Sequence, residues 1–231
     1  NNDGFDDILV GAQQADPNAD GAGSSYVVFG RSLTGQVDLP PAIIALGALD
    51  GDGFRVPGLG AGHFAGYAVS GAGDINGDGF ADFVVGAERA APNGALSSSS
   101  YVVFGRAAGF DADIDLATFD GSNGFRLDGP APQGGLSFLD VSDAGDVNGD
   151  GFDDVLVGVA HAGSYQGRSY VVFGKAGFAA NLDLDDLDGG DGYRIDGTGS
   201  LTYSGRAVSS AGDINGDGFD DLLVGARRSD F

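Results

Sequence analysis

The segment GDINGDGFAD, residues 73–82, is the stretch of the chain that says most about its fold. It returns as GDVNGDGFDD at residues 145–154 and as GDINGDGFDD at residues 212–221, and a shortened copy, NNDGFDD, occupies residues 1–7. Counted from Asp74, oxygen-bearing side chains stand at positions one, three, five and nine, and a glycine stands at position six. This layout is typical of a loop that wraps around a hard cation, and calcium is the cation we expect.

Each copy of the loop offers a similar set of oxygen donors. The ligands expected from the complete loops are the side chains of Asp74, Asn76, Asp78 and Asp82, of Asp146, Asn148, Asp150 and Asp154, and of Asp213, Asn215, Asp217 and Asp221, together with the backbone carbonyls of Phe80, Phe152 and Phe219. The rings of these phenylalanines are expected to turn into the core. The shortened copy retains Asn1, Asp3, Phe5 and Asp7 but lacks the first aspartate, so we expect it to have the lowest affinity for Ca²⁺.

Two other interpretations of the loop deserve comparison. A hairpin turn without metal is one, because Asp, Asn and Gly favour turns in any case; three complete copies with matching positions favour the metal. An EF-hand is the other, and it fails because position twelve, which needs a bidentate Glu, holds Val85, Val157 and Val224. The segments on either side of the loops also favour strands rather than helices.

Other short blocks recur with the loop and define a unit of about 70 residues, since the loop phenylalanines stand at positions 5, 80, 152 and 219. The block SYVVFG is repeated unchanged at residues 25–30, 100–105 and 169–174. We expect one short strand before each loop, a second directly after it, SYVVFG as a third and a Gly-Phe-Arg type segment as a fourth. Such a repeat predicts an all-β chain, a β-propeller built of four-stranded antiparallel blades.

The same blocks divide the chain into a single repeat array over residues 1–231. We expect a partial blade at residues 1–57, complete blades at residues 66–128 and 138–196, and a further partial blade at residues 205–231. The two partial blades would duplicate a second strand if they joined. The array is therefore expected to be a fragment of a larger ring. The absence of Met agrees with a fragment.

The composition is strongly acidic, with 34 Asp and Glu against 11 Lys and Arg and a net charge of −23. No basic patch could displace counterions from phosphates, so nucleic acid is excluded as a partner. No apolar run reaches the length of a membrane span, so direct membrane insertion is not expected. The chain has no Cys. Together these features favour an extracellular or cell-surface protein of bacterial origin.

The loop, the strand before it and the Val-Gly-Ala type segment after it resemble the FG-GAP repeat of integrin α-subunit propellers and of bacterial secreted and surface proteins. The resemblance covers essentially the whole chain. It implies a ring of about seven blades with Ca²⁺ in the hairpin between the first two strands of certain blades. The chain departs from the family pattern where the proline of "GAP" is missing after Gly86, Gly158 and Gly225, and where Phe138 replaces the glycine found as Gly66 and Gly205.

Catalytic machinery is not evident, and we expect the chain not to be an enzyme. His63 and His161 occupy different places in their repeats and are interpreted as loop residues. The neighbouring carboxylates Asp153 and Asp154 point to opposite faces of a strand, so they do not converge on a substrate. Arg55, Arg126 and Arg194 recur at one position and favour a repeated salt bridge between blades or a hydrogen bond to a carbonyl, with a row of ligands for carboxylated sugars as the alternative. Tyr26, Tyr101 and Tyr170 are interpreted as packing residues rather than a sugar platform.

Three functional classes agree with these features. The first is a calcium-binding module that acts in adhesion, or as a scaffold for a protein or glycan ligand at the rim of the propeller. The second is a non-catalytic accessory propeller of a secreted enzyme, such as a lyase or phospholipase. The third is a structural component of a surface layer or filament.

Overall fold

The computed structural model describes residues 3–32, 44–49, 51–94, 97–130 and 138–228, and its ordered elements are nearly all strands. The strands are β1 (Ile8–Ala12), β2 (Ser24–Val28), β3 (Gly53–Pro57), β4 (Ala65–Gly71), β5 (Phe83–Ala87), β6 (Ser99–Val103), β7 (Gly124–Asp128), β8 (Leu139–Gly145), β9 (Asp154–Val159), β10 (Arg168–Val172), β11 (Asn181–Asp183), β12 (Gly192–Asp196), β13 (Ser204–Gly212) and β14 (Asp221–Ala226). One α-helical turn, α1 (Ala162–Tyr165), and two 3₁₀ turns, Leu116–Thr118 and Leu184–Asp186, complete the described elements. The expectation of an all-β chain is confirmed.

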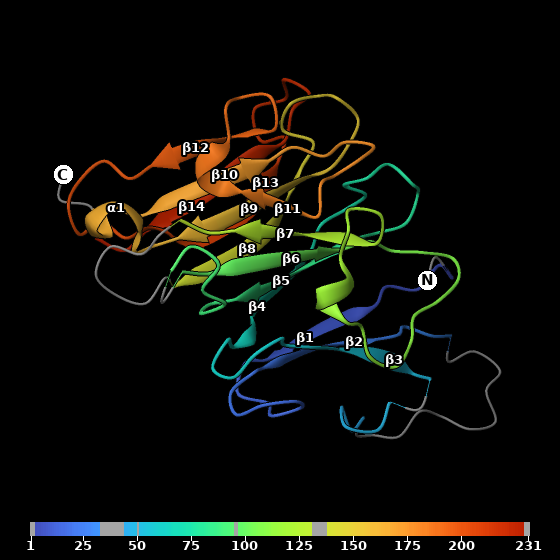
Figure 1. The fold of residues 1–231 in the computed structure, drawn as a ribbon. Coiled ribbons are helices and arrows are strands. Elements are labelled where there is room, and N and C mark those ends of the chain that lie inside the picture. Colours follow the sequence, from blue (N-terminus) through green and yellow to red (C-terminus); the bar gives the residue numbers. More distant parts are fainter. Residues whose placement is uncertain (1–2, 33–43, 50, 95–96, 131–137, 229–231) are drawn as a thin grey trace.

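The strands form successive sheets that follow one another in chain order (Figure 1). Their orders are β1-β2-β3, then β4-β5-β6-β7 with β11 added at the outer edge, then β8-β9-β10-β12, and finally β13-β14. Consecutive strands within each sheet pair antiparallel, as expected. The first strands of the sheets are neighbours, because β4 contacts β8 and β8 contacts β13. The sheets therefore stack as propeller blades, and within the described residues they do not close into a ring.

The repeated block SYVVFG forms the middle of each complete sheet. In β6, for example, Tyr101 pairs with Val85 on one side and with Arg126 on the other. Its valines and tyrosine are buried on both faces, because a sheet packs against each face of the blade. Tyr26, Tyr101 and Tyr170 are likewise buried in the three copies, which confirms their interpretation as packing residues.

An unexpected feature lies at the outer edge of the sheets. β11 belongs to the segment between β10 and β12, yet it pairs in parallel with β7 of the preceding sheet. The corresponding segment one repeat earlier does the same, since Arg55 of β3 donates its N–H to the carbonyl of Ala112 at 2.8 Å and accepts from the N–H of Ile114 at 2.9 Å. The connecting segments of one repeat thus cover the last strand of the repeat before it.

One departure from the repeat pattern has a clear backbone consequence. Gly66 and Gly205, near the start of β4 and β13, adopt φ of 80° and 77°, a left-handed conformation that glycine reaches without strain. Phe138 stands at the same place and has φ of 43°. In this repeat the strand begins directly after Phe138, at Leu139, whereas Gly66 and Gly205 lie inside β4 and β13.

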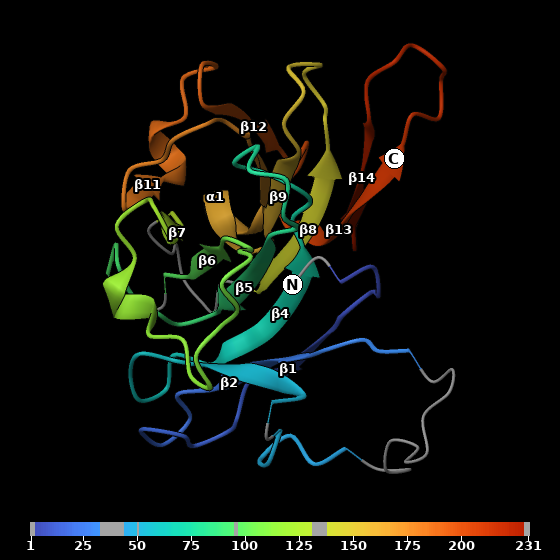
Figure 2. The same ribbon diagram turned by 90° about the vertical axis from the view of Figure 1, so that its right-hand side faces the viewer.

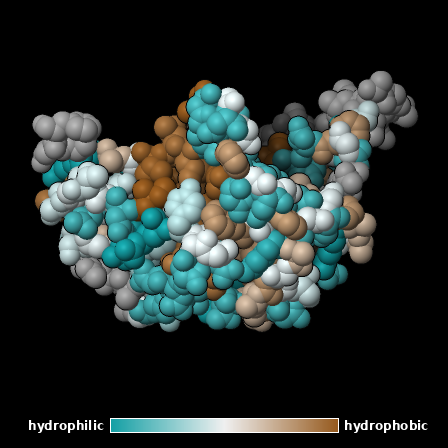
Figure 3. Space-filling view, turned by 90° about the horizontal axis from the view of Figure 1, so that it is seen from above, coloured by the Kyte–Doolittle hydropathy of each residue, from teal (hydrophilic) through white to brown (hydrophobic). Residues whose placement is uncertain are grey.

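The last sheet leaves one face uncovered. Leu223 of β14 is 64% exposed, whereas Leu156 at the same position of β9 is fully buried. Ile214, in the loop between β13 and β14, is 76% exposed, whereas the equivalent Ile75 is fully buried. A patch of apolar side chains is visible among hydrophilic neighbours on the surface shown in Figure 3. Within the described residues, the burial of one blade thus depends on the blade that follows.

This difference predicts unequal effects of one substitution at two equivalent positions. Leu156→Ala removes a fully buried side chain from between two sheets and should lower the free energy of unfolding by about 2–5 kcal/mol. Leu223→Ala, the matched control, should change it by no more than about 0.5 kcal/mol. Urea denaturation followed by circular dichroism measures both values. Equal losses of unfolding free energy in the two variants would contradict this stacking order of the sheets.

Candidate metal-binding loops

The repeated loops connect the first two strands of successive sheets. Residues 73–82 join β4 to β5, residues 145–154 join β8 to β9, and residues 212–221 join β13 to β14. Figure 2 shows the loops between β8 and β9 and between β13 and β14 projecting beside one another from the same side of the molecule. Of the shortened first copy, Asp3, Phe5 and Asp7 are described and precede β1, while the expected ligand Asn1 lies outside the described residues.

All three complete loops are curled by the same hydrogen bonds. In the first of them, the carboxylate of Asp74 accepts from the N–H groups of Asp78 at 2.9 Å and Gly79 at 2.8 Å. The side-chain oxygen of Asn76 also accepts from the N–H of Asp78. The other two loops repeat this pattern around Asp146 and Asp213, with distances between 2.8 and 3.1 Å. Local side-chain to backbone hydrogen bonds of this kind hold the side-chain oxygens of positions one, three and five, the expected metal ligands, on the inside of the curl.

The carboxylate at position nine ties the loops of Asp82 and Asp154 to their sheets, whereas the described bonds of Asp221 stay within its own loop. Asp154 is fully buried, and it accepts from the N–H of Val147 at 3.0 Å and of Gly174, the last residue of the third SYVVFG block, at 2.8 Å. Asp82 makes the same two bonds, to Ile75 at 3.0 Å and Gly105 at 2.7 Å. In Asp221 one oxygen accepts from the N–H of Ile214 at 2.9 Å, and the other accepts from the side chain of Asn215.

Burial and like charge raise the pKa of two position-nine carboxyls, those of Asp82 and Asp154. Burial is the main cause for Asp82, and the charges of Asp78 and Asp74 add to it, so that its pKa rises to about 7. For Asp154 the pKa rises to about 6, again chiefly through burial, with contributions from Asp150 and Asp146. The carboxylates of these two loops thus lie near enough to repel one another. A cation would relieve that repulsion.

The donor set suits a hard cation, although the cage is not closed. Each complete loop combines three aspartates, an asparagine and a carbonyl, all oxygen donors of the kind that Ca²⁺ prefers. Within the part of the chain that the structure describes, no three acidic or histidine side chains are gathered tightly enough to form a finished metal cage. The hydrogen bonds place the side chains of positions one, three and five on one curl, and the full ligand set stays a prediction.

The loop phenylalanines occupy a position that we did not expect. Their rings do not enter the core: the ring of Phe152 lies over Gly77 of the preceding loop, where a Cβ atom would come within 2.4 Å of the ring, and the ring of Phe219 lies over Gly149 in the same way. Glycine at position four is required for this approach. Two loops thus touch directly, which sequence periodicity alone did not reveal because the contact joins neighbouring repeats.

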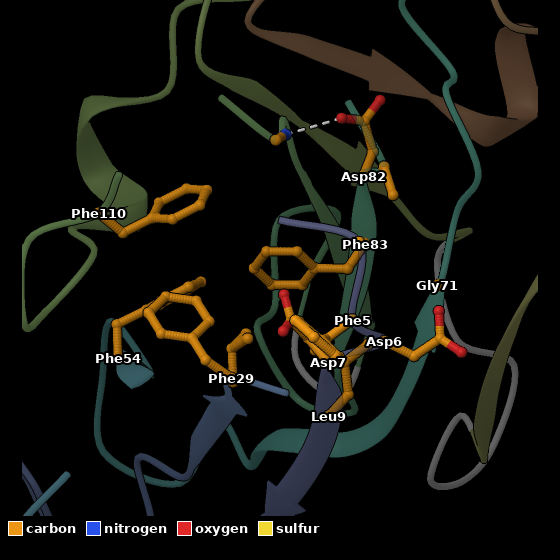
Figure 4. Close-up of a pocket in the computed structure, with 14 residues that line it drawn as sticks. Phe5, Asp6, Asp7, Leu9, Phe29, Phe54, Gly71, Asp82, Phe83 and Phe110 are labelled. Carbon is orange, nitrogen blue, oxygen red and sulfur yellow. Dashed lines mark hydrogen bonds between the residues drawn. The ribbon is translucent and has the colours of Figure 1, made fainter. Parts of the chain in front are cut away.

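A cavity of about 540 Å³ lies between the first two sheets and is lined in part by the shortened loop (Figure 4). Phe54 stacks on Phe110 with ring centroids 4.3 Å apart, and Phe29 lies 5.8 Å from Phe54. The next junction contains the same arrangement, in which Phe125 stacks on Phe178 at 4.1 Å beside Phe104. The aromatic lining of the cavity is therefore a repeated packing element of the fold rather than a feature special to one site.

The three recurring arginines all form ion pairs with aspartates. Arg55 forms two bonds of 2.8 Å with Asp113 of the following repeat, and Arg126 and Arg194 pair with aspartates two residues further along their own strands. The expected salt bridge between blades is therefore confirmed at Arg55, but it is wrong at Arg126 and Arg194, whose ion pairs lie within one strand. Asp153 and Asp154 diverge as expected, since they bond to different segments.

The sequence did not identify the glycine that ends each SYVVFG block as part of the site. The N–H groups of Gly30, Gly105 and Gly174 donate to the position-nine carboxylates Asp7, Asp82 and Asp154. A Cβ atom on Gly105 would lie 2.4 Å from the carbonyl oxygen of Ala81, so no larger residue fits. The same glycine ends all three SYVVFG blocks, and this repetition was the sequence signal that could have identified it.

Comparison with known proteins gives a consistent result. The model of the FG-GAP repeat matches residues 1–28, 65–102, 138–172 and 204–230, which together contain all four copies of the loop. Integrin alpha-PS5 of Drosophila melanogaster is 31% identical over 165 residues, which is 71% of this chain and 15% of that protein. Integrin alpha-4 of Xenopus laevis is 28% identical over 178 residues, 77% of this chain and 16% of that protein. The chain thus spans less than a fifth of the length of these relatives.

Removal of a position-nine carboxylate should reveal its structural role. Asp154→Ala leaves the N–H groups of half-buried Val147 and buried Gly174 without their acceptor, so the free energy of unfolding should fall by about 1–3 kcal/mol without added metal. Asp221→Ala is the matched control, because Asp221 is less buried and its described bonds stay within its own loop. We expect a smaller loss there, measured by urea denaturation. A larger loss for Asp221→Ala would refute this role.

Proposed function

Because this chain belongs to the FG-GAP repeat family, we propose that it is a calcium-binding β-propeller module of a cell-surface or extracellular protein. Its role in this proposal is adhesion, with a protein or glycan ligand held at the rim of the propeller. The finer division into blades at residues 1–57, 66–128, 138–196 and 205–231 belongs to the same proposal. The bacterial origin expected from composition stays a prediction.

The observation that carries the calcium proposal is the threefold repetition of one oxygen-rich curl. Position one curls the loop through the N–H groups of positions five and six, and position nine anchors it to the sheet. An Asx turn without metal would need neither a buried carboxylate at position nine nor three carboxylates around a single curl. Burial of the Asp82 and Asp154 carboxylates is unfavourable because it removes their charge from water, and a bound divalent cation would offset that desolvation.

The oxygen ligands of the loops would determine which metal ion the chain binds. Carboxylates at positions one, five and nine, the amide oxygen at position three and the carbonyl at position seven would hold Ca²⁺ in the three complete loops. When bound, the ion supplies positive charge that draws these oxygens together. The hairpin between the first two strands of each blade then becomes rigid, and the loops at that end of the propeller keep a fixed position.

An adhesive role is supported by the relatives, whose names identify them as integrin alpha subunits. Their similarity extends over most of this chain, including the loops. None of the helices among the described residues is long and apolar enough to cross a membrane. We accordingly propose a non-catalytic binding module, with the acidic surface excluding nucleic acid as the ligand.

Calcium should stabilise the protein against unfolding. Binding to the native state alone adds about 2.7 kcal/mol per site when free Ca²⁺ is 100 times the dissociation constant. We expect the melting temperature to rise with Ca²⁺ and to fall again with EGTA, and calorimetric titration to count three sites. Mg²⁺ at the same concentration is the control and should have a smaller effect, because it requires stricter octahedral geometry. A melting curve unaffected by Ca²⁺ and EGTA would overturn the proposal.

The adhesive role requires a separate test. The chain, immobilised in 1 mM Ca²⁺ or in EGTA, would be probed with a glycan array and with an array of extracellular proteins. We expect binding that is present in Ca²⁺ and lost in EGTA, because the ion fixes the loops at the rim. The triple variant Asp74→Ala, Asp146→Ala, Asp213→Ala should resemble the EGTA sample. Binding that does not depend on the ion or on these aspartates would contradict the proposal.

A further inference from the structure

Neighbouring metal-binding loops are joined by a contact that repeats from one junction to the next. The carboxylate of Asp153, at position eight of its loop, accepts from the N–H of Asp74 in the preceding loop at 2.7 Å. The N–H of Asp153 returns a longer bond of 3.5 Å to the carbonyl oxygen of Asp74. One repeat later, Asp220 accepts from the N–H of Asp146 at 2.9 Å and donates to its carbonyl at 3.2 Å.

The residue held by these hydrogen bonds is the position-one aspartate. Its carboxylate accepts the hydrogen bonds that close the curl of its own loop. Asp74 accepts from the N–H groups of Asp78 and Gly79, so a shift of its backbone would displace both bonds. A phenylalanine adds a second point of contact, since the ring of Phe152 lies over Gly77 of the same preceding loop. Asp153 and Phe152 together therefore fix one end of the loop at residues 73–82.

The glycine before position one shows how closely this contact is fitted. A Cβ atom on Gly73 would lie 2.0 Å from the carboxylate of Asp153, and one on Gly145 would lie 2.0 Å from that of Asp220. The equivalent Gly212 has nothing within 4 Å in the described structure. The close approach at Gly73 and Gly145 is therefore made by the following loop and not by the turn to which each glycine belongs.

We propose that Asp153 and Asp220 are positioning residues, each of which sets the calcium affinity of the preceding loop and not of its own. This inference rests on the proposed function, because it concerns the same calcium loops. Asp153 acts on the loop of Asp74, and Asp220 acts on the loop of Asp146. The loop of Asp213 has no such partner among the described residues. The loops are thus unequal, although their ligands are the same.

Two observations separate this role from general packing. Position eight is not itself one of the expected ligands, and Ala81 occupies it in the loop at residues 73–82, so the fold accepts alanine there. Asp6 occupies position eight of the shortened loop, and its exposed side chain makes no hydrogen bond to another loop within the described residues. Substitution at Asp6 therefore removes the same charge without removing the contact.

The experiment follows the glycine amide signals of each loop by NMR during a Ca²⁺ titration of the full chain. Gly79 reports on the loop of Asp74, and Gly151 reports on the loop of Asp146. In Asp153→Ala we expect the dissociation constant read at Gly79 to rise about tenfold, the lower end of the effect of removing an outer-shell partner, and that read at Gly151 to change less than about twofold. Asp220→Ala should raise the constant at Gly151 instead. Asp6→Ala, the control, should change neither.

A conservative variant separates positioning from charge. Asp153→Asn retains an oxygen that can accept from the N–H of Asp74 but loses the negative charge. Affinity at Gly79 close to that of the native protein supports positioning, whereas a loss as large as in Asp153→Ala means that charge alone acts and overturns the proposal.

Two further outcomes separate failure of the positioning role from failure of the calcium proposal. If the native loops respond to Ca²⁺ but Asp153→Ala leaves the affinity at Gly79 unchanged, or weakens Gly151 equally, the positioning role is wrong and the calcium proposal stands. If no loop glycine of the native protein responds to Ca²⁺, the calcium proposal itself fails, and the positioning role fails with it.

Discussion

The fold depends on a buried carboxylate that joins a loop to the end of the third strand of its own sheet. Asp82 and Asp154 each accept one N–H from the start of their loop and one from the glycine that ends the SYVVFG strand. A buried carboxylate is unfavourable unless its oxygens are hydrogen-bonded, and here the backbone provides those bonds. The loop cannot shift without breaking them. The position of the candidate metal ligands is therefore determined by the sheet, and the ligands themselves are at the same time part of the sheet's framework.

Much of this arrangement could be predicted from the sequence, because the signals are local and repeated. The strand before each loop, the strand after it and the SYVVFG strand appear where the alternation of apolar, polar and glycine residues indicated. The side chains at positions one, three and five of each complete loop gather on one curl for the same reason, since their spacing in the chain determines their spacing in space. The burial of Tyr101 and Tyr170 follows from their place in a central strand.

The features that could not be predicted all join different repeats. Asp153 bonds to Asp74 across 79 positions of the chain, and β11 pairs with a strand more than 50 residues earlier. Nothing in the local pattern distinguishes Asp153 from an ordinary turn residue. The ring of Phe152 was expected in the core because apolar side chains usually are, yet a glycine in the neighbouring loop leaves room for it at the surface. Contacts of this kind depend on how blades are rotated relative to one another, which a single repeat does not encode.

The pairing of β11 with β7 gives the array a direction. An exposed strand edge presents free N–H and C=O groups to any other chain, and proteins usually protect it. Here the segment that protects the edge of one sheet belongs to the following repeat, as do the residues that grip its loop. During synthesis from the amino terminus, each sheet must therefore remain open until its successor emerges. Growth by duplication of repeats would have the same polarity, because a repeat added at the carboxyl-terminal end shields the one before it and leaves its own edge for the next.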